Sequence, residues 1–148
     1  MQKVLFSSKT DQWATPQSFF DSLNDEFHFD LDPCADVNNH KAELYFTKED
    51  DGLSKDWSGH RVFCNPPYGR TIGKWVEKAF EEGTKKNTLV VLLIPARTDT
   101  SYFHDYIYNR AEIRFVPGRL KFGDSSTGAP FPSMVVIFRG PKMQRKIA

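Results

Sequence analysis

The run Leu89–Ile94 consists of apolar residues alone, either leucine or β-branched. A short run with no polar residue on either face is typical of a strand that is buried on both sides. Such strands occur mainly in α/β proteins, where helices cover both faces of a parallel sheet. The run is also far shorter than the roughly 20 residues that a membrane span requires. We therefore expect an α/β fold and no membrane partner.

Helical patterns flank this strand on both sides. Thr15 and Pro16 are a capping residue and a preferred first helical residue, and they predict the start of a helix. The apolar positions that follow have helical spacing: Phe19, Phe20, Leu23 and Phe27. A second helix is predicted from Thr71 to Gly83. A third is expected to begin at Asp99 or Thr100 and to continue to Ile107.

Four further strands are predicted, together with one extended patch. The strands are Phe27–Leu31, Arg61–Cys64, Glu112–Val116 and Ser133–Phe138, and the first of them leads into Asp32-Pro33. The extended patch is Leu44-Tyr45-Phe46, inside a loop over 36–58. The last two strands follow each other without a helix. They should form an antiparallel pair joined by the loop 117–132, on a sheet that is otherwise mostly parallel.

The 148 residues are enough for one domain. We expect a loose arm over 1–10, the domain over 11–140 and a basic tail over 141–148. Cys34 and Cys64 form no CxxC pair, which disfavours metal and redox motifs. No signal peptide pattern is present, so a cytoplasmic setting is expected.

The charge is divided along the chain. Residues 1–96 hold 11 Lys and Arg against 15 Asp and Glu, whereas residues 97–148 hold 9 against 4. A basic final third can indicate contact with a polyanion. An unevenly charged solvated surface is the alternative.

The segment Asn65-Pro66-Pro67-Tyr68 carries the most specific chemistry. Two prolines stiffen the turn, so that the Pro66 carbonyl and the Asn65 side-chain oxygen are acceptors held in set directions. The Tyr68 ring offers a face for stacking. These groups suit a planar amine: they accept its N–H bonds and leave its lone pair free to attack an electrophile. A rigid turn without chemistry is the alternative.

This segment is similar to motif IV of amino-methyltransferases, and the wider chain resembles the phage-type DNA N6-adenine methyltransferases. The resemblance covers roughly residues 11–140. Its other motifs, in order, are Trp13-Ala14-Thr15-Pro16, Phe29–Pro33, Asp51-Gly52-Leu53, Trp57, Gly118–Phe122 and Pro130–Ser133. It implies a Rossmann-like class I sheet and transfer of a methyl group from S-adenosylmethionine to adenine N6 in DNA. It also implies a modification enzyme of phage or prophage origin in a bacterial host.

The resemblance also implies roles for individual residues. Catalysis falls to Asn65, Pro66, Pro67 and Tyr68. Cofactor contacts fall to Thr15 and Pro16, to the loop residues Asp32, Pro33, Cys34 and Ala35, and to Asp51. The glycine-rich loop usual after the first strand is missing. Plain alternatives exist: Thr15 as a helix cap, Asp32 as a structural carboxylate, and Asp51 as a turn residue.

Nucleic-acid contacts are expected downstream. The candidates are Arg70, Arg97, Arg119, Lys121, Phe122 and Phe131, which would hold phosphates or stack on a base. The expected partner is double-stranded DNA with a flipped adenine, bound by a monomer or homodimer. No metal ligand set is predicted. The alternatives are a related methyltransferase acting on RNA adenine or a protein glutamine, and a catalytically silent nucleic-acid-binding domain.

Overall fold

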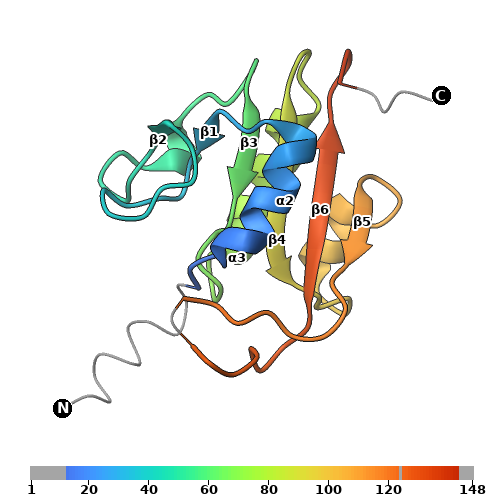
Figure 1. Cartoon of the computed structure of the whole chain (residues 1–148). Helices are drawn as coiled ribbons and strands as arrows, with labels where there is room; N and C mark the ends of the chain where they lie inside the picture. Colours follow the sequence, from blue (N-terminus) through green and yellow to red (C-terminus); the bar gives the residue numbers. More distant parts are fainter. Residues whose placement is uncertain (1–12, 124, 144–148) are drawn as a thin grey trace.

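The computed structural model describes residues 13–123 and 125–143, and it contains a six-stranded mixed sheet between helices (Figure 1). The strands are β1 (Leu31–Asp32), β2 (Leu44–Tyr45), β3 (Arg61–Cys64), β4 (Leu89–Pro95), β5 (Glu112–Phe115) and β6 (Ser133–Arg139). Their order across the sheet is β2-β1-β3-β4-β6-β5. The first four strands are parallel, and β6 runs antiparallel to both β4 and β5. The α/β prediction and the antiparallel C-terminal hairpin are therefore confirmed.

Strand β4 lies at the centre, and all seven of its residues are buried. It pairs with β3 on one side and with β6 along its whole length on the other. Both faces and both edges of β4 are thus covered, which explains why its sequence contains no polar residue.

Helix α2 (Gln17–Phe27) covers one face of the sheet, and α3 (Ile72–Gly83) covers the other (Figure 1). The buried side of α2 consists of Phe20, Leu23 and Phe27, at helical spacing. Phe27 therefore ends the helix. The prediction that a strand begins at Phe27 is wrong, because β1 begins only at Leu31. The helix stops at His28, which has a left-handed backbone conformation with φ of 55°.

Two further expectations about the helices are corrected by the structure. Thr15 does not cap α2: the capping residue is Pro16, and no side-chain cap bond is present. The predicted third helix is only a wide helical turn, η2 (Phe103–Ile107), whose closing bond runs from the Tyr108 N–H to the Phe103 carbonyl over 2.8 Å. Gly83 is the last residue of α3, as predicted, and a Cβ there would lie 2.4 Å from the Phe138 Cβ on β6, so this close approach requires glycine.

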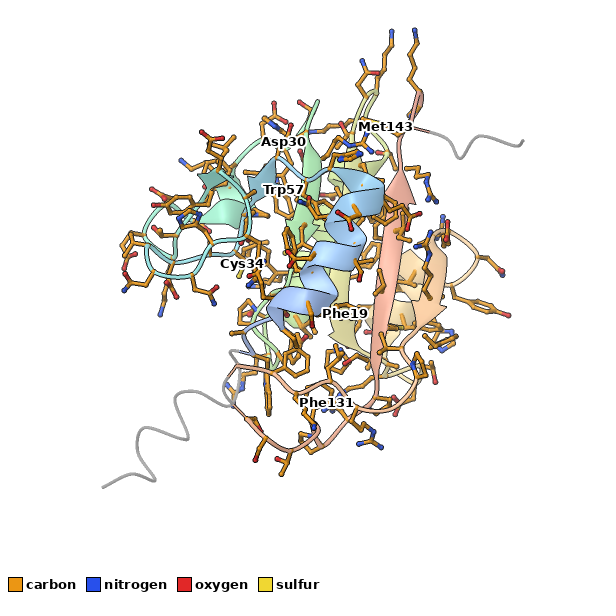
Figure 2. All side chains as sticks on the ribbon, in the orientation of Figure 1. Phe19, Asp30, Cys34, Trp57, Phe131 and Met143 are labelled. Atoms are coloured by element: carbon orange, nitrogen blue, oxygen red, sulfur yellow. The ribbon has the colours of Figure 1, made fainter. Side chains whose placement is uncertain are left out.

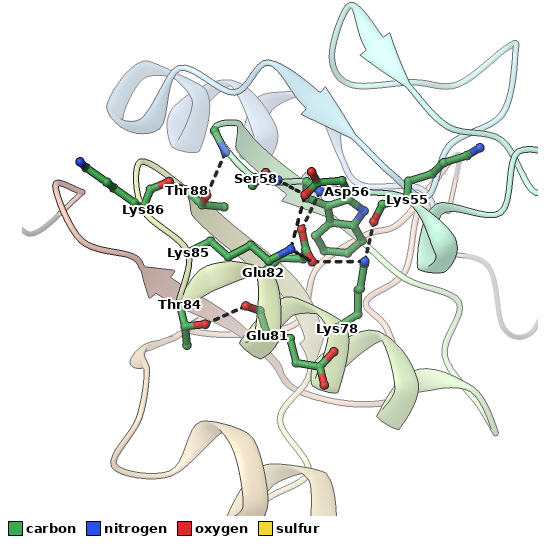
Figure 3. A network of polar contacts seen from close by, with 12 residues as sticks. Lys55, Asp56, Ser58, Lys78, Glu81, Glu82, Thr84, Lys85, Lys86 and Thr88 are labelled. Carbon is green, nitrogen blue, oxygen red and sulfur yellow. Dashed lines mark hydrogen bonds and ion pairs between the residues drawn. The ribbon is translucent and has the colours of Figure 1, made fainter.

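A buried carboxylate ties α3 to the segment that follows the 3-10 turn η1 (Gly52–Ser54). Glu82 is only 4% exposed, and it accepts the Trp57 backbone N–H over 2.6 Å. Its other oxygen pairs with Lys85 at 2.7 Å and Lys78 at 3.3 Å, as Figure 3 shows. A buried charge is tolerated because it is paired and hydrogen-bonded. The network holds Trp57, and with it the η1 segment, in place beside the sheet.

The ends of the chain are described only in part. The expected arm over 1–10 lies outside the described residues, as do residues 144–148 of the expected tail. The start of that tail is packed: the Asn87 N–H donates to the Pro141 carbonyl over 2.8 Å, and the Met143 N–H donates to Gly140. Within 13–123 and 125–143, no helix has the length and apolar character to span a membrane.

Candidate active site at the carboxyl edge of the sheet

The parallel strands β1, β3 and β4 all end at the same edge of the sheet, at the lower side of Figure 1. The chain order reverses at this place: β2 lies on one side of β1, whereas β3 and β4 lie on the other. Ligands of open α/β sheets bind at such a switch point, outside the carboxyl ends of the strands. The two segments that flank this point are Asp32–Ala35 after β1 and Asn65–Tyr68 after β3, as the sequence predicts.

The Asn65 side chain is held in one orientation. Its amide nitrogen donates to the Thr15 Oγ1 over 2.9 Å and to the backbone carbonyl of Trp13. Because a carbonyl only accepts, this atom must be the NH2 group, and the other atom must be the oxygen. That oxygen, Asn65 Oδ1, is buried and has no hydrogen-bond partner among the described residues. The site therefore contains a fixed acceptor that is ready for a donor from a ligand.

Tyr68 is anchored through its hydroxyl group. The hydroxyl donates to the Leu93 carbonyl of β4 over 3.1 Å, and the residue is only 6% exposed. Burial raises the pKa of Tyr68 far above its usual value. The phenol therefore stays protonated, and it serves as a rigid flat surface and not as a general base. Pro66 is also buried, so the turn between Asn65 and Tyr68 is firmly seated.

Four aromatic rings meet at this edge, and we refer to Trp13, Tyr68, Phe122 and Phe131 as the aromatic box. Trp13 and Tyr68 are nearly parallel, at 19° with centroids 6.4 Å apart. Phe122 and Phe131 stand at 72° and 86° to Trp13, with centroids 5.7 and 5.1 Å from it. They stand at 90° and 77° to Tyr68. Trp13 and Tyr68 thus form a nearly parallel pair, and Phe122 and Phe131, whose centroids are 5.9 Å apart, form two side walls in contact with both.

The long loop 117–132 carries both side walls across the carboxyl edge. Figure 1 shows it passing below the sheet, and Figure 2 shows Phe131 on it, below the lower end of α2. The Gly123 N–H donates to the Ala14 carbonyl over 2.9 Å, which joins the loop to the segment before α2. Loops of this length without secondary structure are commonly functional in compact domains.

Thr15 is 6% exposed, and its hydroxyl oxygen accepts the Asn65 amide bond described above. The structure thus places Thr15 against Asn65, the catalytic candidate. The sequence had not predicted this contact. The sequence signal that was available is the Trp13-Ala14-Thr15-Pro16 motif itself, because Trp13 and Thr15 supply the two acceptors for Asn65.

Asp32 shapes the loop that follows β1. Its two carboxylate oxygens accept the backbone N–H groups of Cys34, over 3.2 Å, and of Lys41, over 2.9 Å. Burial raises the pKa of Asp32, although these two bonds act in the opposite direction. The structural alternative for Asp32 therefore has direct contacts in its favour. Cofactor contacts by the Pro33–Ala35 backbone stay a prediction.

Asp51 lies beside that loop, because the next residue packs against it. A Cβ at Gly52 would lie 2.0 Å from the Pro33 carbonyl oxygen, so only glycine allows this approach. The Gly52 carbonyl also accepts the Trp57 indole N–H over 3.0 Å. Asp51 is exposed and has φ of 59°. The structure thus brings together the cofactor candidates after β1 and the one at Asp51.

The two cysteines are unsuited to nucleophilic chemistry. Burial raises the pKa of Cys34 to about 12, and it raises the pKa of the fully buried Cys64 well above its usual range. Both thiols are therefore protonated at neutral pH, and the thiolate is the nucleophilic form. Among the described residues, no group of three or more His, Cys, Asp or Glu side chains is arranged to hold a metal ion.

The basic candidates Arg70, Arg97, Arg119 and Lys121 are all exposed. Arg119 and Lys121 border an open groove of about 430 Å³ on the first turns of α2. Its other lining residues are Pro16, Ser18, Phe19, Ser22 and Leu120. Ser18 and Ser22 were not singled out from the sequence, and Phe19 was named only as an apolar helix position, because this pattern suits an ordinary helix face.

Phe122 and Phe131 are only 4% and 7% exposed. Their rings point inward onto Trp13 and Tyr68 and not onto an open surface. Contact of these two rings with a nucleic acid stays a prediction, and it would have to take place inside the aromatic box.

Comparison with known proteins gives consistent matches. The family model described as DNA N-6-adenine-methyltransferase (Dam) matches residues 2–148. A protein of Haemophilus phage HP1 (strain HP1c1), named DNA N-6-adenine-methyltransferase, is 32% identical over 139 residues, which cover 88% of this chain and 80% of that protein. One of the same name from Escherichia phage T1 is 31% identical over 112 residues, covering 74% of this chain but only 46% of the phage protein.

Proposed function

The chain belongs to the DNA N-6-adenine-methyltransferase family, and on that premise we infer that it transfers a methyl group to the exocyclic N6 amine of adenine in DNA. We further propose that the donor is S-adenosylmethionine and that the sheet is of the Rossmann-like class I type. The reversal of strand order between β1 and β3 supports this assignment.

The observation that carries the proposal is the buried oxygen of Asn65 at the end of β3, which has no hydrogen-bond partner within residues 13–123 and 125–143. A buried acceptor without a donor is costly unless a ligand completes it. An adenine amine would do so, because its N–H points at the acceptor while the ring lies against an aromatic face. Asn65 then orients the amine lone pair, and the Tyr68 ring holds the base plane.

The residues after β1 fit the donor. Gly52, the residue after the exposed Asp51, packs against the Pro33 carbonyl of this loop, and the strand before the loop pairs with β3, which leads into Asn65. When bound, S-adenosylmethionine supplies a methyl group on a sulfonium, with a thioether as the leaving group. Asn65 and Tyr68 would direct the N6 lone pair at that methyl group, and the amine would release one proton to solvent once the methyl group is transferred.

The chain contributes positioning and a dry environment. Exocyclic amines are weak nucleophiles, so orientation and electrostatic stabilisation are what the site must supply. Neither the thiols nor the Tyr68 phenol acts as a base, because burial keeps them protonated. Because the site is buried, the target base must leave the duplex to enter it.

Arg70, Arg97, Arg119 and Lys121 are proposed to hold the DNA backbone, with the groove along α2 as part of its path. Contacts of this kind position the duplex and add a salt-dependent term to the affinity. We propose that the protein acts as a monomer or homodimer inside a bacterial host, as a phage or prophage modification enzyme.

The test is expression in cells that lack adenine methylation, followed by sequencing of their DNA for N6-methyladenine. We expect modified adenine with the wild type and none with Asn65→Ala, because losing one such positioned interaction costs on the order of 10²-fold or more. Asn65→Ala should keep its donor affinity within a few-fold. Asn38→Ala, at an exposed loop asparagine, is the matched control. Unmodified DNA together with methylated RNA or protein would reassign the substrate, and absence of donor binding would leave a silent nucleic-acid-binding domain.

A further inference from the structure

The aromatic box leaves no open face on Tyr68 for a base. Tyr68 is 6% exposed, and Trp13 lies parallel to it while Phe122 and Phe131 close two sides. A flipped adenine that stacks on Tyr68 must therefore enter the box itself. The geometry then determines which ring contacts the second face of this adenine.

We propose that Trp13 is the second stacking surface for the target adenine, which binds between the Trp13 and Tyr68 rings. The inference rests on the proposed function, and it assigns to Trp13 a role in positioning the base. The two rings are already nearly parallel, as a sandwich requires, whereas Phe122 and Phe131 face the slot with a different orientation.

The slot must widen when the base enters. The ring planes of Trp13 and Tyr68 are at most 6.4 Å apart, because plane separation cannot exceed centroid separation. A base in van der Waals contact on both faces needs about 7 Å, from two contacts of about 3.5 Å each. The rings therefore have to separate by at least about half an ångström.

Trp13 is the ring that moves. Tyr68 is buried and is tied to the Leu93 carbonyl on the central strand. Trp13 is partly exposed and lies in the irregular segment before α2. Its bond to the Asn65 amide is made by its backbone carbonyl and does not involve its ring. Base entry and the orientation of the catalytic amide are therefore compatible.

The surroundings of the slot match a whole nucleotide. Leu120 and Lys121 precede the Phe122 wall in the chain, and they also line the groove beside α2. Pro16, three residues after Trp13, lines the same groove. A base in the slot would thus have cationic side chains of Arg119 and Lys121 near the path of its phosphates, where anions are favoured.

The test replaces the Trp13 ring while keeping apolar bulk at that position. Trp13→Phe retains an aromatic face, whereas Trp13→Leu fills similar space without one. The backbone carbonyl that binds Asn65 is the same in both variants. Phe80→Leu is the matched control, since Phe80 is also partly buried and packs edge-to-face, on Phe138 of β6 and away from the carboxyl edge.

Two measurements are made on each variant after thermal unfolding and donor binding have been checked. The first is the single-turnover rate of methyl transfer to DNA from methylation-free cells. The second is the fluorescence of a duplex in which the mapped target adenine is replaced by 2-aminopurine, which brightens on leaving the stack. We expect Trp13→Leu to lower the rate by roughly 5- to 150-fold, the loss of one base–aromatic stack, and to reduce the brightening. Trp13→Phe should recover most of both, and Phe80→Leu should change neither.

A Trp13→Leu enzyme that matches or exceeds the wild type in rate and brightening would overturn the proposal, because Trp13 would then be a cover that the base displaces. Equal losses in Trp13→Phe and Trp13→Leu would also overturn it, since an aromatic face would not be what matters. A wild type that fails to methylate DNA refutes the proposed function instead, so the two failures are distinguishable.

Discussion

Replacement of Thr15 by valine tests how the amide of Asn65, the proposed catalytic group, is held. Valine has nearly the shape of threonine but lacks the hydroxyl oxygen that accepts the Asn65 N–H over 2.9 Å. One buried N–H of Asn65 then loses its partner, and the bond to the Trp13 carbonyl alone holds the side chain. We expect the amide to rotate more freely, so that its oxygen spends less time directed at the target amine.

The magnitude follows from the burial of this contact. A donor left unsatisfied beside residue 15, where Thr15 is 6% exposed, costs about 1–3 kcal/mol of folding stability. For a domain of this size that is a fall in Tm of roughly 2–12 °C. Catalysis should fall by about 10-fold in kcat, less than in Asn65→Ala, because the acceptor is still present but poorly oriented.

The assay is single-turnover methyl transfer at saturating donor, together with calorimetric donor binding and thermal unfolding, for Thr15→Val and Thr15→Ser. Serine keeps the hydroxyl group and should restore most of the rate. Donor affinity should change little in either variant. If Thr15→Val instead lost donor affinity at an unchanged kcat, Thr15 would be a cofactor contact, as the family resemblance implies, and our reasoning would be refuted.

Three other predictions follow from charge and burial. Combined Arg119→Ala and Lys121→Ala should weaken DNA binding and lower the slope of log affinity against log salt by about 0.9 for each lost phosphate contact. Titrations at several salt concentrations measure this slope, and a slope equal to that of the wild type would contradict the prediction. Alkylation of Cys34 should be slow at pH 8 in the folded protein, because its pKa is raised to about 12, and mass spectrometry would show fast labelling only after unfolding. The hydrogen bond to Arg114 lowers the pKa of Glu26 below its usual 4.5. The Glu26–Arg114 pair therefore stabilises the fold above that pH, and this stabilisation is lost as the pH falls. The Tm difference between wild type and Glu26→Gln should vanish in acid, and a difference that stays constant with pH would contradict this prediction.

Much of the fold follows from local patterns. The unbroken apolar run of β4 requires cover on both faces, and two packed helices provide it. The absence of a helix between the last two strands predicts their antiparallel pairing, which the register of β5 on β6 confirms. The errors occur where two patterns overlap: Phe27 suits both the end of a helix and the start of a strand, and the tertiary contacts of α2 decide for the helix.

The candidate site also combines features that the sequence predicts with contacts that only the tertiary structure shows. The sequence by itself predicted Asn65–Tyr68 as an amine-binding turn, because an amide, two stiffening prolines and a ring follow one another there, and this role stays a prediction. It also placed Asp32 and Asn65 at one edge, since parallel strands end together. Only the tertiary structure decided that Thr15 and Trp13 hold the Asn65 amide, 50 and 52 residues away along the chain. Hydrogen bonds and ring contacts of that kind depend on how a segment before α2 and a loop before β6 cross the sheet edge, and no local pattern carries that information.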